Sequence, residues 1–204
     1  MRGRERVALA DYGAGNLRSL ASALVRAGAE PVVTVDPAVV ADAPLAVIAG
    51  VGHVESAAAG LEQHGLDRAL RERVAAGRPV AGICVGLQLL FGESEEGGEG
   101  LGLLAGPVRR LRAGRVPHMG WNTLEATRTS ALLEGVDGAD VYFAHSFAVE
   151  PADPALATAT VDHEGRVVAA VEDGPLAGVQ FHPERSAAPG ARVLENLLRW
   201  SRSA

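Results

Sequence analysis

The alternation of short β-like runs with longer helical segments constrains the fold of this chain more than any other feature of its sequence. In the first half, short apolar runs bounded by glycine or proline precede alanine- and leucine-rich segments with helical spacing. This pattern is typical of parallel strands joined by crossover helices. The expected strands are residues 6–10, 30–35, 45–49 and 79–84, and the expected helices are residues 16–27, 60–76 and 85–91. We therefore predict an α/β fold with an open, mostly parallel central sheet flanked by helices.

The second half of the chain is richer in short strands. They are expected at residues 108–111, 123–126, 141–149, 157–161, 167–171 and 176–181, with a last helix at residues 190–200. The acidic, glycine-rich segment 93–102 is typical of a surface loop, and a lid is the alternative. Because the 204 residues contain no internal repeat and no linker-like tract, we expect a single domain that spans residues 1–204.

Composition excludes several classes of function. A net charge of −6 gives no overall positive field that would attract nucleic acid or an anionic membrane. The sequence contains no lysine, which excludes Schiff-base chemistry. Cys84 is the only cysteine, so no intrachain disulfide can form. No signal-peptide core or membrane-spanning run is evident, and a cytoplasmic protein is expected. The histidines and Cys84 never approach metal-ligand spacing, so we expect neither a metal nor a cofactor.

The segment Gly82-Ile83-Cys84-Val85-Gly86 places a cysteine where a predicted strand meets a predicted helix. A nucleophile at such a turn occupies strained backbone, and glycine neighbours let the turn close and the substrate approach. The following helix directs its free N–H groups at the sulfur, which favours the thiolate. The alternative is that Cys84 is simply a small buried hydrophobic residue.

A candidate base lies in the segment Gly178 to Glu184, GVQFHPE. In extended chain the side chains of His182 and Glu184 project to the same side, so the carboxylate can accept the Nδ1–H bond and leave Nε2 free. An exposed turn is the alternative interpretation. Because Cys84 and His182 both follow predicted strands, they are expected to meet at one edge of the sheet.

Five motifs together resemble a known family. GICVGLQLLF around Cys84 and GVQFHPERS around His182 resemble the class I, or triad-type, glutamine amidotransferases, whose fold is flavodoxin-like. DYGAGNLRSL, VPHMGWN and YFAHSF narrow the resemblance to the glutaminase subunits of imidazole glycerol phosphate synthase. The similarity runs in order from about residue 7 to residue 200, and the combination of motifs is far more specific than any one of them.

The resemblance implies a role for particular residues. Cys84 would attack the carboxamide of glutamine, His182 would protonate the leaving ammonia, and Glu184 would orient His182. The oxyanion would be held by the N–H of Val85 and by an N–H in the turn that contains Val51 and Gly52. Substrate glutamine would be bound by Gln88 and by the backbone near Ser146 and Phe147.

The resemblance also implies a partner, a (β/α)8-barrel cyclase that forms a heterodimer with the glutaminase and uses its ammonia in histidine biosynthesis. The candidate docking residues lie in the subgroup-specific motifs and comprise Asn16, Arg18, Met119, Trp121, Asn122 and Arg185. One departure is that Ala49 stands where the family usually has proline before the Gly50-Val51-Gly52 turn. Alanine loosens the restraint on φ at that position.

Several alternatives stay open at the level of sequence. The nearest is a glutaminase subunit for anthranilate, purine or pyridoxal phosphate synthesis, followed by a cysteine-dependent peptidase or deglycase and by a non-enzymatic interaction module. His118 and His145 are interpreted either as hydrogen-bonding residues behind the site or as packed histidines. The arginine run 109–115 is interpreted as a solvated face, with an acidic docking patch on the partner as the alternative.

Overall fold

A central sheet of eight strands forms the core of the computed structural model, which describes residues 4–13 and 17–203. The sheet has the order β2-β1-β3-β4-β12-β11-β10-β7. Five neighbouring strands are parallel, namely β2 (Ala29–Thr34), β1 (Glu5–Ala10), β3 (Leu45–Gly50), β4 (Val80–Cys84) and β12 (Leu176–Val179). The antiparallel extension consists of β11 (Arg166–Asp173), β10 (Ala157–Asp162) and β7 (Glu125–Ala126). The predicted fold class is confirmed.

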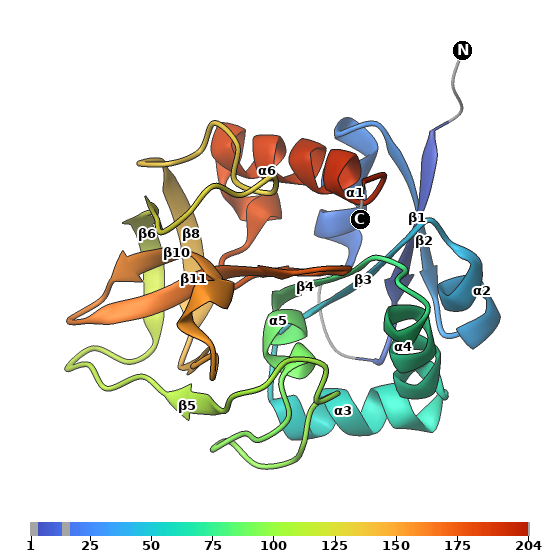
Figure 1. Cartoon of the computed structure of the whole chain (residues 1–204), viewed down its shortest axis with the longest axis horizontal. Helices are drawn as coiled ribbons and strands as arrows, with labels where there is room; N and C mark the ends of the chain where they lie inside the picture. Colours follow the sequence, from blue (N-terminus) through green and yellow to red (C-terminus); the bar gives the residue numbers. More distant parts are fainter. Residues whose placement is uncertain (1–3, 14–16, 204) are drawn as a thin grey trace.

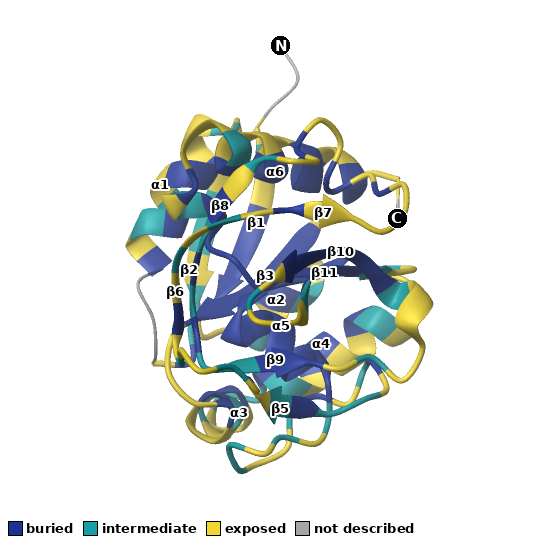
Figure 2. Cartoon of the chain, turned by 90° about the vertical axis from the view of Figure 1, so that its left-hand side faces the viewer, coloured by how far each residue is buried: buried dark blue, intermediate teal, exposed yellow. Residues whose placement is uncertain are grey.

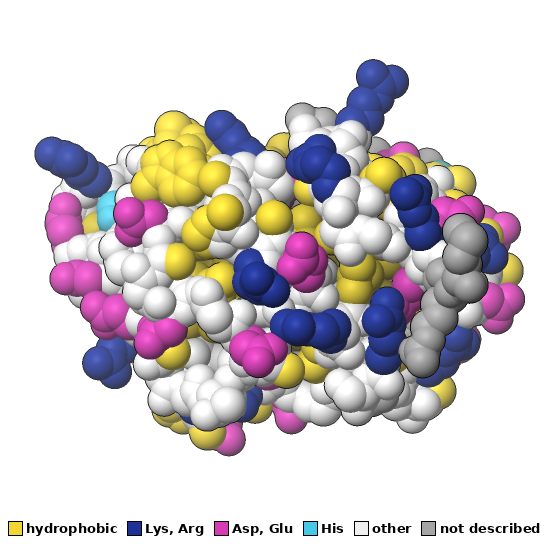
Figure 3. All heavy atoms as spheres, turned by 90° about the horizontal axis from the view of Figure 1, so that it is seen from above, with side chains coloured by type: hydrophobic (Ala, Val, Ile, Leu, Met, Phe, Trp, Pro, Cys, Tyr) yellow, Lys and Arg dark blue, Asp and Glu magenta, His cyan; other side chains and the backbone are white. Residues whose placement is uncertain are grey.

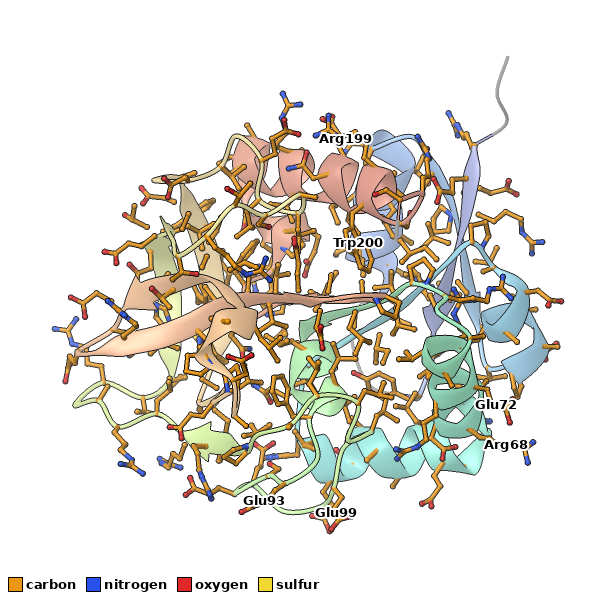
Figure 4. All side chains as sticks on the ribbon, in the orientation of Figure 1. Arg68, Glu72, Glu93, Glu99, Arg199 and Trp200 are labelled. Atoms are coloured by element: carbon orange, nitrogen blue, oxygen red, sulfur yellow. The ribbon has the colours of Figure 1, made fainter. Side chains whose placement is uncertain are left out.

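Helices cover both faces of this sheet (Figure 1). On one face lie α1 (Leu17–Arg26) and α6 (Ala187–Trp200), and on the other lie α3 (Val54–Gln63), α4 (Leu66–Ala75) and α5 (Val85–Leu90). The short helix α2 (Pro37–Asp42) packs beside α4. Trp200 points from α6 toward the sheet whereas Arg199 points away from it (Figure 4), as expected for a helix with one apolar face.

The middle of the sheet is buried on both sides. Every residue of β3 and β4 is buried, and Figure 2 shows β3 in the dark blue, buried middle of the molecule. Parallel strands that are covered on both faces have continuous apolar sequences, which is the pattern of residues 45–49 and 79–84.

Smaller elements surround the carboxyl end of the parallel strands. Two additional sheets pair β5 (Val108–Arg110) with β9 (Phe147–Val149) and β6 (His118–Thr123) with β8 (Asp140–His145). Two 3-10 turns, η1 (Pro154–Leu156) and η2 (Pro183–Arg185), complete the fold. Among the described residues, none of the helices has the length and apolar character needed to cross a membrane.

Two predicted elements differ from the structure, and two observed elements were not predicted. The helix expected at 60–76 is two helices, α3 and α4, because Gly65 adopts a left-handed conformation with φ 67° between them. The strand expected at 141–149 is interrupted at Ser146, which separates β8 from β9. The strand β6 and the helix α2 were not expected, since Gly120 interrupts the segment His118–Thr123 and Pro37–Asp42 is short.

Candidate active site

Cys84 occupies strained backbone at the corner between β4 and α5. Its φ of 56° and ψ of −111° lie in a region that non-glycine residues rarely adopt, and the residue is buried. A Cβ on Gly86 would overlap the carbonyl oxygen of Ile48, and a Cβ on Gly82 would overlap the carbonyl of Gly86. The two glycines therefore allow α5 to pack against β3 and β4, as their positions in the motif indicated.

His182 and Glu184 are joined by a direct hydrogen bond. The Nδ1–H of His182 donates to Oε1 of Glu184 over 2.9 Å, and both side chains are nearly buried. The spacer between them is not extended, as the sequence had led us to expect, but begins the 3-10 turn η2. The Ser186 hydroxyl stabilises this turn by donating to the carbonyl of His182 over 2.6 Å. The expected pairing is therefore present, but a tight turn produces it.

The charge state of His182 depends on Cys84. Burial lowers the pKa of His182, but the hydrogen-bonding and electrostatic interactions of Cys84 and Glu184 outweigh burial and raise the pKa to about 10. Glu184 engages Nδ1, whereas Nε2 is buried and has no other hydrogen-bond partner among the described residues. The fold thus brings the sulfur and the imidazole together from distant parts of the sequence, with Nε2 available for proton exchange.

A cavity of about 200 Å³ opens beside Cys84. Its lining includes the predicted oxyanion residues and the predicted substrate residues, together with Met119 from the predicted docking set; these are Val51, Gly52, Val85, Gln88, Met119, Ser146 and Phe147. Gly52 has φ 110°, a conformation that glycine adopts without strain. The volume suits a ligand of amino-acid size rather than a polymer.

Two residues at this site were missed by sequence analysis. Gln180 is fully buried, and its Nε2–H donates to Sγ of Cys84 over 3.7 Å. Its Oε1 accepts a hydrogen bond of 3.1 Å from Nε2 of Gln88. One feature of the sequence could have identified Gln180: it lies two residues before His182, and residues two apart in a strand project to the same side.

Glu96 is the second missed residue. It lines the cavity, and its side chain is only 10% exposed although it lies in the acidic segment that was expected to be a surface loop. Oε1 bonds to Nδ1 of His53 over 2.8 Å, and Oε2 accepts from the N–H of Val54 over 2.9 Å. Sequence could not distinguish Glu96 from the other glutamates of its segment, because all are flanked by small or acidic residues.

The predicted docking residues differ in their exposure to solvent and in the side chains that they contact. Met119 and Trp121 are 66% and 54% exposed on β6, and hydrophobic side chains gather at the end of the molecule that carries β6 and β8 (Figure 3). The Arg185 guanidinium lies 4.1 Å above the ring of Tyr142, which in turn meets Trp121 edge-on. Arg18 is exposed on α1, whereas Asn16 lies outside the described residues.

Asn122 and the two motif histidines are engaged within the fold. Nδ2 of Asn122 lies 3.2 Å from Nε2 of His118, and Nδ1 of His118 lies 3.1 Å from Nε2 of His145. Burial, as the main cause, lowers the pKa of His118 to about 4 and that of His145 to about 3. The geometry contains features of both interpretations: His118 bonds to side chains, whereas His145 is buried at the cavity wall and also bonds to the backbone carbonyl of Phe147.

The arrangement of the charged groups in the described residues also bears on metal binding. Within residues 4–13 and 17–203, no group of three or more His, Cys, Asp or Glu residues is placed to hold a metal ion. In the arginine run, Arg109 pairs with Glu93 and Glu95 at 3.3 and 3.4 Å. Arg110, Arg112 and Arg115 belong to surface segments.

Comparison with known proteins identifies the family. The family model described as glutamine amidotransferase class-I matches residues 8–200. The chain is 46% identical over 194 residues to imidazole glycerol phosphate synthase subunit HisH of Moorella thermoacetica, with 93% of this chain and 92% of the relative covered. It is 48% identical over 199 residues to HisH of Mycolicibacterium paratuberculosis, with 94% and 96% covered. The resemblance that the motifs indicated is confirmed.

Solved structures share the fold at low sequence identity. A crystal structure of a glutamine amidotransferase superposes with a TM-score of 0.78 at 20% identity and covers 96% of this chain and 98% of its own. The structure of PurLQS from Thermotoga maritima gives 0.75 at 20% identity, with 97% and 99% covered. At such identities the likeness concerns the fold alone. By its matching family model and its HisH relatives, the chain belongs to the class-I glutamine amidotransferase family.

Proposed function

We propose that this chain is the glutaminase subunit of imidazole glycerol phosphate synthase, which hydrolyses L-glutamine and supplies the ammonia to a cyclase subunit in histidine biosynthesis. The observation that carries the proposal is the strained Cys84 elbow, which interacts with the His182–Glu184 pair beside a cavity of about 200 Å³. The HisH relatives support the pathway. No cofactor is needed, because the nucleophile, the acid–base group and its orienting carboxylate all come from the chain.

The first half of the reaction forms a thioester. The Cys84 thiolate attacks the carboxamide carbon, and the resulting oxyanion accepts hydrogen bonds from the N–H of Val85 and from an N–H of the Val51–Gly52 turn. The carbon–nitrogen bond then breaks while the imidazolium of His182 donates its Nε2 proton to the departing nitrogen. Ammonia leaves, and a glutamyl thioester stays on the sulfur.

The second half of the reaction restores the enzyme. Neutral His182 removes a proton from a water molecule, whose oxygen attacks the thioester carbon. The carbon–sulfur bond breaks, glutamate leaves, and the thiolate again faces the imidazolium. Glu184 holds the ring through Nδ1 in both halves, so Nε2 always faces the reacting atoms.

Substrate recognition follows from the charges in the cavity. The α-ammonium group of glutamine requires an acceptor or a carboxylate, and Glu96 supplies a nearly buried carboxylate at the cavity wall. Gln88 and the backbone of Ser146 and Phe147 form another part of the wall. The amide of Gln180 lies beside the sulfur, where it supports the position of Cys84.

The exposed residues of β6 are the centre of the proposed docking face for the (β/α)8-barrel cyclase. Met119 lines the cavity and is also exposed, so a partner that covers Met119 and Trp121 would close the cavity against solvent. Ammonia that reaches bulk water is protonated and lost as a nucleophile, which makes a sealed heterodimer interface a mechanistic need. Arg18 and Arg185 complete the proposed face, whereas the predicted docking residue Asn122 is engaged by His118, Asp162 and Thr123 within the fold. The whole chain is proposed to act as a single domain in the cytoplasm.

Glutamate release by the purified chain tests this proposal, measured alone and with the cyclase subunit and its nucleotide ligand. We expect weak hydrolysis alone and a strong increase with the cyclase. Cys84→Ala is expected to abolish both. Undiminished activity in Cys84→Ala would refute the nucleophile, and a lack of response to the cyclase would indicate the glutaminase of another pathway.

A further inference from the structure

We propose that Asn122, His118 and His145 form a hydrogen-bonded relay that positions the carbonyl of Phe147, and with it Gln88, at the wall of the catalytic cavity. The relay connects the docking strand β6 to the substrate site, so this inference rests on the proposed function. The three residues are positioning residues: the ring of His145 lies at the cavity wall, but its two nitrogens bond to His118 and to the Phe147 carbonyl.

The relay is continuous from the strand to the cavity. From Asn122 it passes over 3.2 Å to Nε2 of His118, and from Nδ1 of His118 over 3.1 Å to Nε2 of His145. Nδ1 of His145 then meets the carbonyl oxygen of Phe147 over 2.8 Å. The same oxygen accepts a second hydrogen bond of 2.8 Å from Nε2 of Gln88. Phe147, Gln88 and His145 all line the cavity, so the relay reaches its wall at His145.

Each hydrogen in the relay has only one possible place. The carbonyl of Phe147 can only accept, so Nδ1 of His145 carries a hydrogen and Nε2 of the neutral ring must accept. His118 consequently donates from Nδ1 and accepts at Nε2 from the amide of Asn122. That amide is oriented independently, because Nδ2 also donates to the carbonyl of Asp162 and Oδ1 accepts from the N–H of Thr123, both over 2.8 Å.

Packing holds the middle of the relay rigidly. The ring of His118 stacks on Phe143 at 4.5 Å and on His163 at 4.1 Å, with interplanar angles of 16° and 21°. His163 is itself fixed through Nε2, which lies 2.7 Å from the carbonyl of Arg115. Because both faces of the His118 ring are packed, the ring cannot rotate freely. A displacement of β6 therefore shifts the ring and the hydrogen bonds that it makes.

The strand that carries the relay also carries the docking residues. Along β6 the side chains alternate, so His118 and Asn122 face inward while Met119 and Trp121 face solvent. His118 stands directly opposite His145 in the antiparallel register of β6 and β8. A partner that contacts Met119 and Trp121 therefore displaces β6 and with it Asn122 and His118, the first residues of the relay. The Phe147 carbonyl, at the other end of the relay, responds to that displacement.

Substitutions at His145 separate positioning from simple packing. His145→Leu removes the donor to Phe147, whereas the Nδ2–H of asparagine in His145→Asn occupies the place of the imidazole Nδ1–H and restores it. In the complex with the cyclase we expect His145→Leu to raise KM for glutamine about tenfold, with a smaller effect on kcat, as loss of one buried hydrogen bond implies. His145→Asn is expected to recover most of this loss, and His64→Phe serves as a control outside the site. An unchanged KM in His145→Leu, or no recovery in His145→Asn, would overturn the relay.

A spectroscopic measurement on the wild-type chain is independent of activity and of variant folding. We expect ¹⁵N imidazole spectra to show both His118 and His145 as Nδ1–H tautomers, and their signals to shift when the cyclase binds. His118→Phe identifies the His118 signal and preserves the stacking on Phe143. An Nε2–H tautomer in either ring, or signals that do not respond to the bound cyclase, would contradict the relay. Absence of glutaminase activity in the wild-type complex would instead contradict the proposed function.

Discussion

A charged imidazole beside the sulfur is the residue-level feature that controls the chemistry of this chain. The pKa of His182 in the folded protein is about 10, above its ordinary value of 6.5. A raised folded-state pKa contributes stability that is fully present below the unfolded pKa and is lost as the pH rises through the folded value. The pair formed by His182 and its neighbours should therefore be stable at neutral pH and weaken in alkaline solution.

Replacing Glu184 with glutamine tests this charge coupling. Glu184→Gln removes one of the interactions that raise the pKa of His182. We expect a lower His182 pKa by NMR titration, a smaller decrease in the free energy of unfolding between neutral pH and pH 10, and a kcat reduced by roughly 10² to 10⁴. An unaltered titration of His182 would show that Cys84 alone sets its charge.

Backbone strain at Cys84 predicts a conflict between stability and activity. Glycine adopts a φ of 56° and a ψ of −111° without a Cβ clash, whereas alanine does not. We expect Cys84→Gly and Cys84→Ala to be equally inactive, with the glycine variant more stable by about 1 kcal/mol in urea unfolding. A more stable alanine variant would mean that the strain is relieved elsewhere.

At the scale of elements, Arg73 joins α4 to the end of α2 and the start of β4. Its buried guanidinium donates to the carbonyls of Val40, Ala41 and Ala43 at 2.7 to 2.9 Å, and also to Pro79 at 2.9 Å. These acceptors include carbonyls at the carboxyl end of α2 that have no partner within the helix. Burial, followed by the charge of Arg78, lowers the pKa of Arg73 to about 10, so it stays protonated at neutral pH.

Truncating Arg73 should destabilise the protein far more than truncating a surface arginine. We expect Arg73→Met to lower the free energy of unfolding by about 3 kcal/mol, because several buried carbonyls lose their donor. Arg68→Met is the matched control, since Arg68 lies on the same helix with an exposed ion pair to Glu72 (Figure 4). The control should change stability by less than about 0.5 kcal/mol in the same unfolding experiment.

The packing of α5 against β3 depends on the absence of a side chain at Gly86. A Cβ there would overlap the Ile48 carbonyl, so Gly86→Ala must displace the helix that follows the nucleophile. We expect a loss of at least about 2 kcal/mol in stability together with loss of glutamine hydrolysis. Gly92→Ala is the control, because its Cβ would make only an ordinary contact of 3.7 Å with Gly102. Equal stabilities of the two variants would contradict the close packing.

At the scale of the whole molecule, the site lies at the carboxyl end of the central strand β4, and Met119, an exposed hydrophobic residue of β6, lines its cavity. We expect Trp121→Ala to weaken binding of the cyclase by about 2 kcal/mol in calorimetry, as loss of an aromatic anchor typically does. Stability of the isolated chain should change little, because Trp121 is already exposed. Val33→Ala removes a different exposed side chain, on the edge strand β2, and should leave binding intact.

The sequence by itself determined the fold class and the local chemistry. Strand and helix periodicity is a property of neighbouring residues, so β1, β3, β4 and α5 were predicted within one or two residues of their observed bounds. The strained turn at Cys84 was also predicted from the sequence, because such a turn requires small residues at neighbouring positions and Gly82 and Gly86 occupy them. The break between α3 and α4 was not predicted, because the helical spacing of leucine and alanine continues through Gly65. Only the left-handed backbone of Gly65 separates the two helices.

Only the tertiary structure decided which distant residues share a cavity and what charge they carry. Glu96 and Gln180 gained their positions from contacts with His53, Val54, Gln88 and Cys84, none of which lies within a few residues in sequence. The same holds for the pKa of His182 and for the bond between His118 and His145. Burial and electrostatic coupling depend on every element packed around a group, and local sequence patterns do not contain that information.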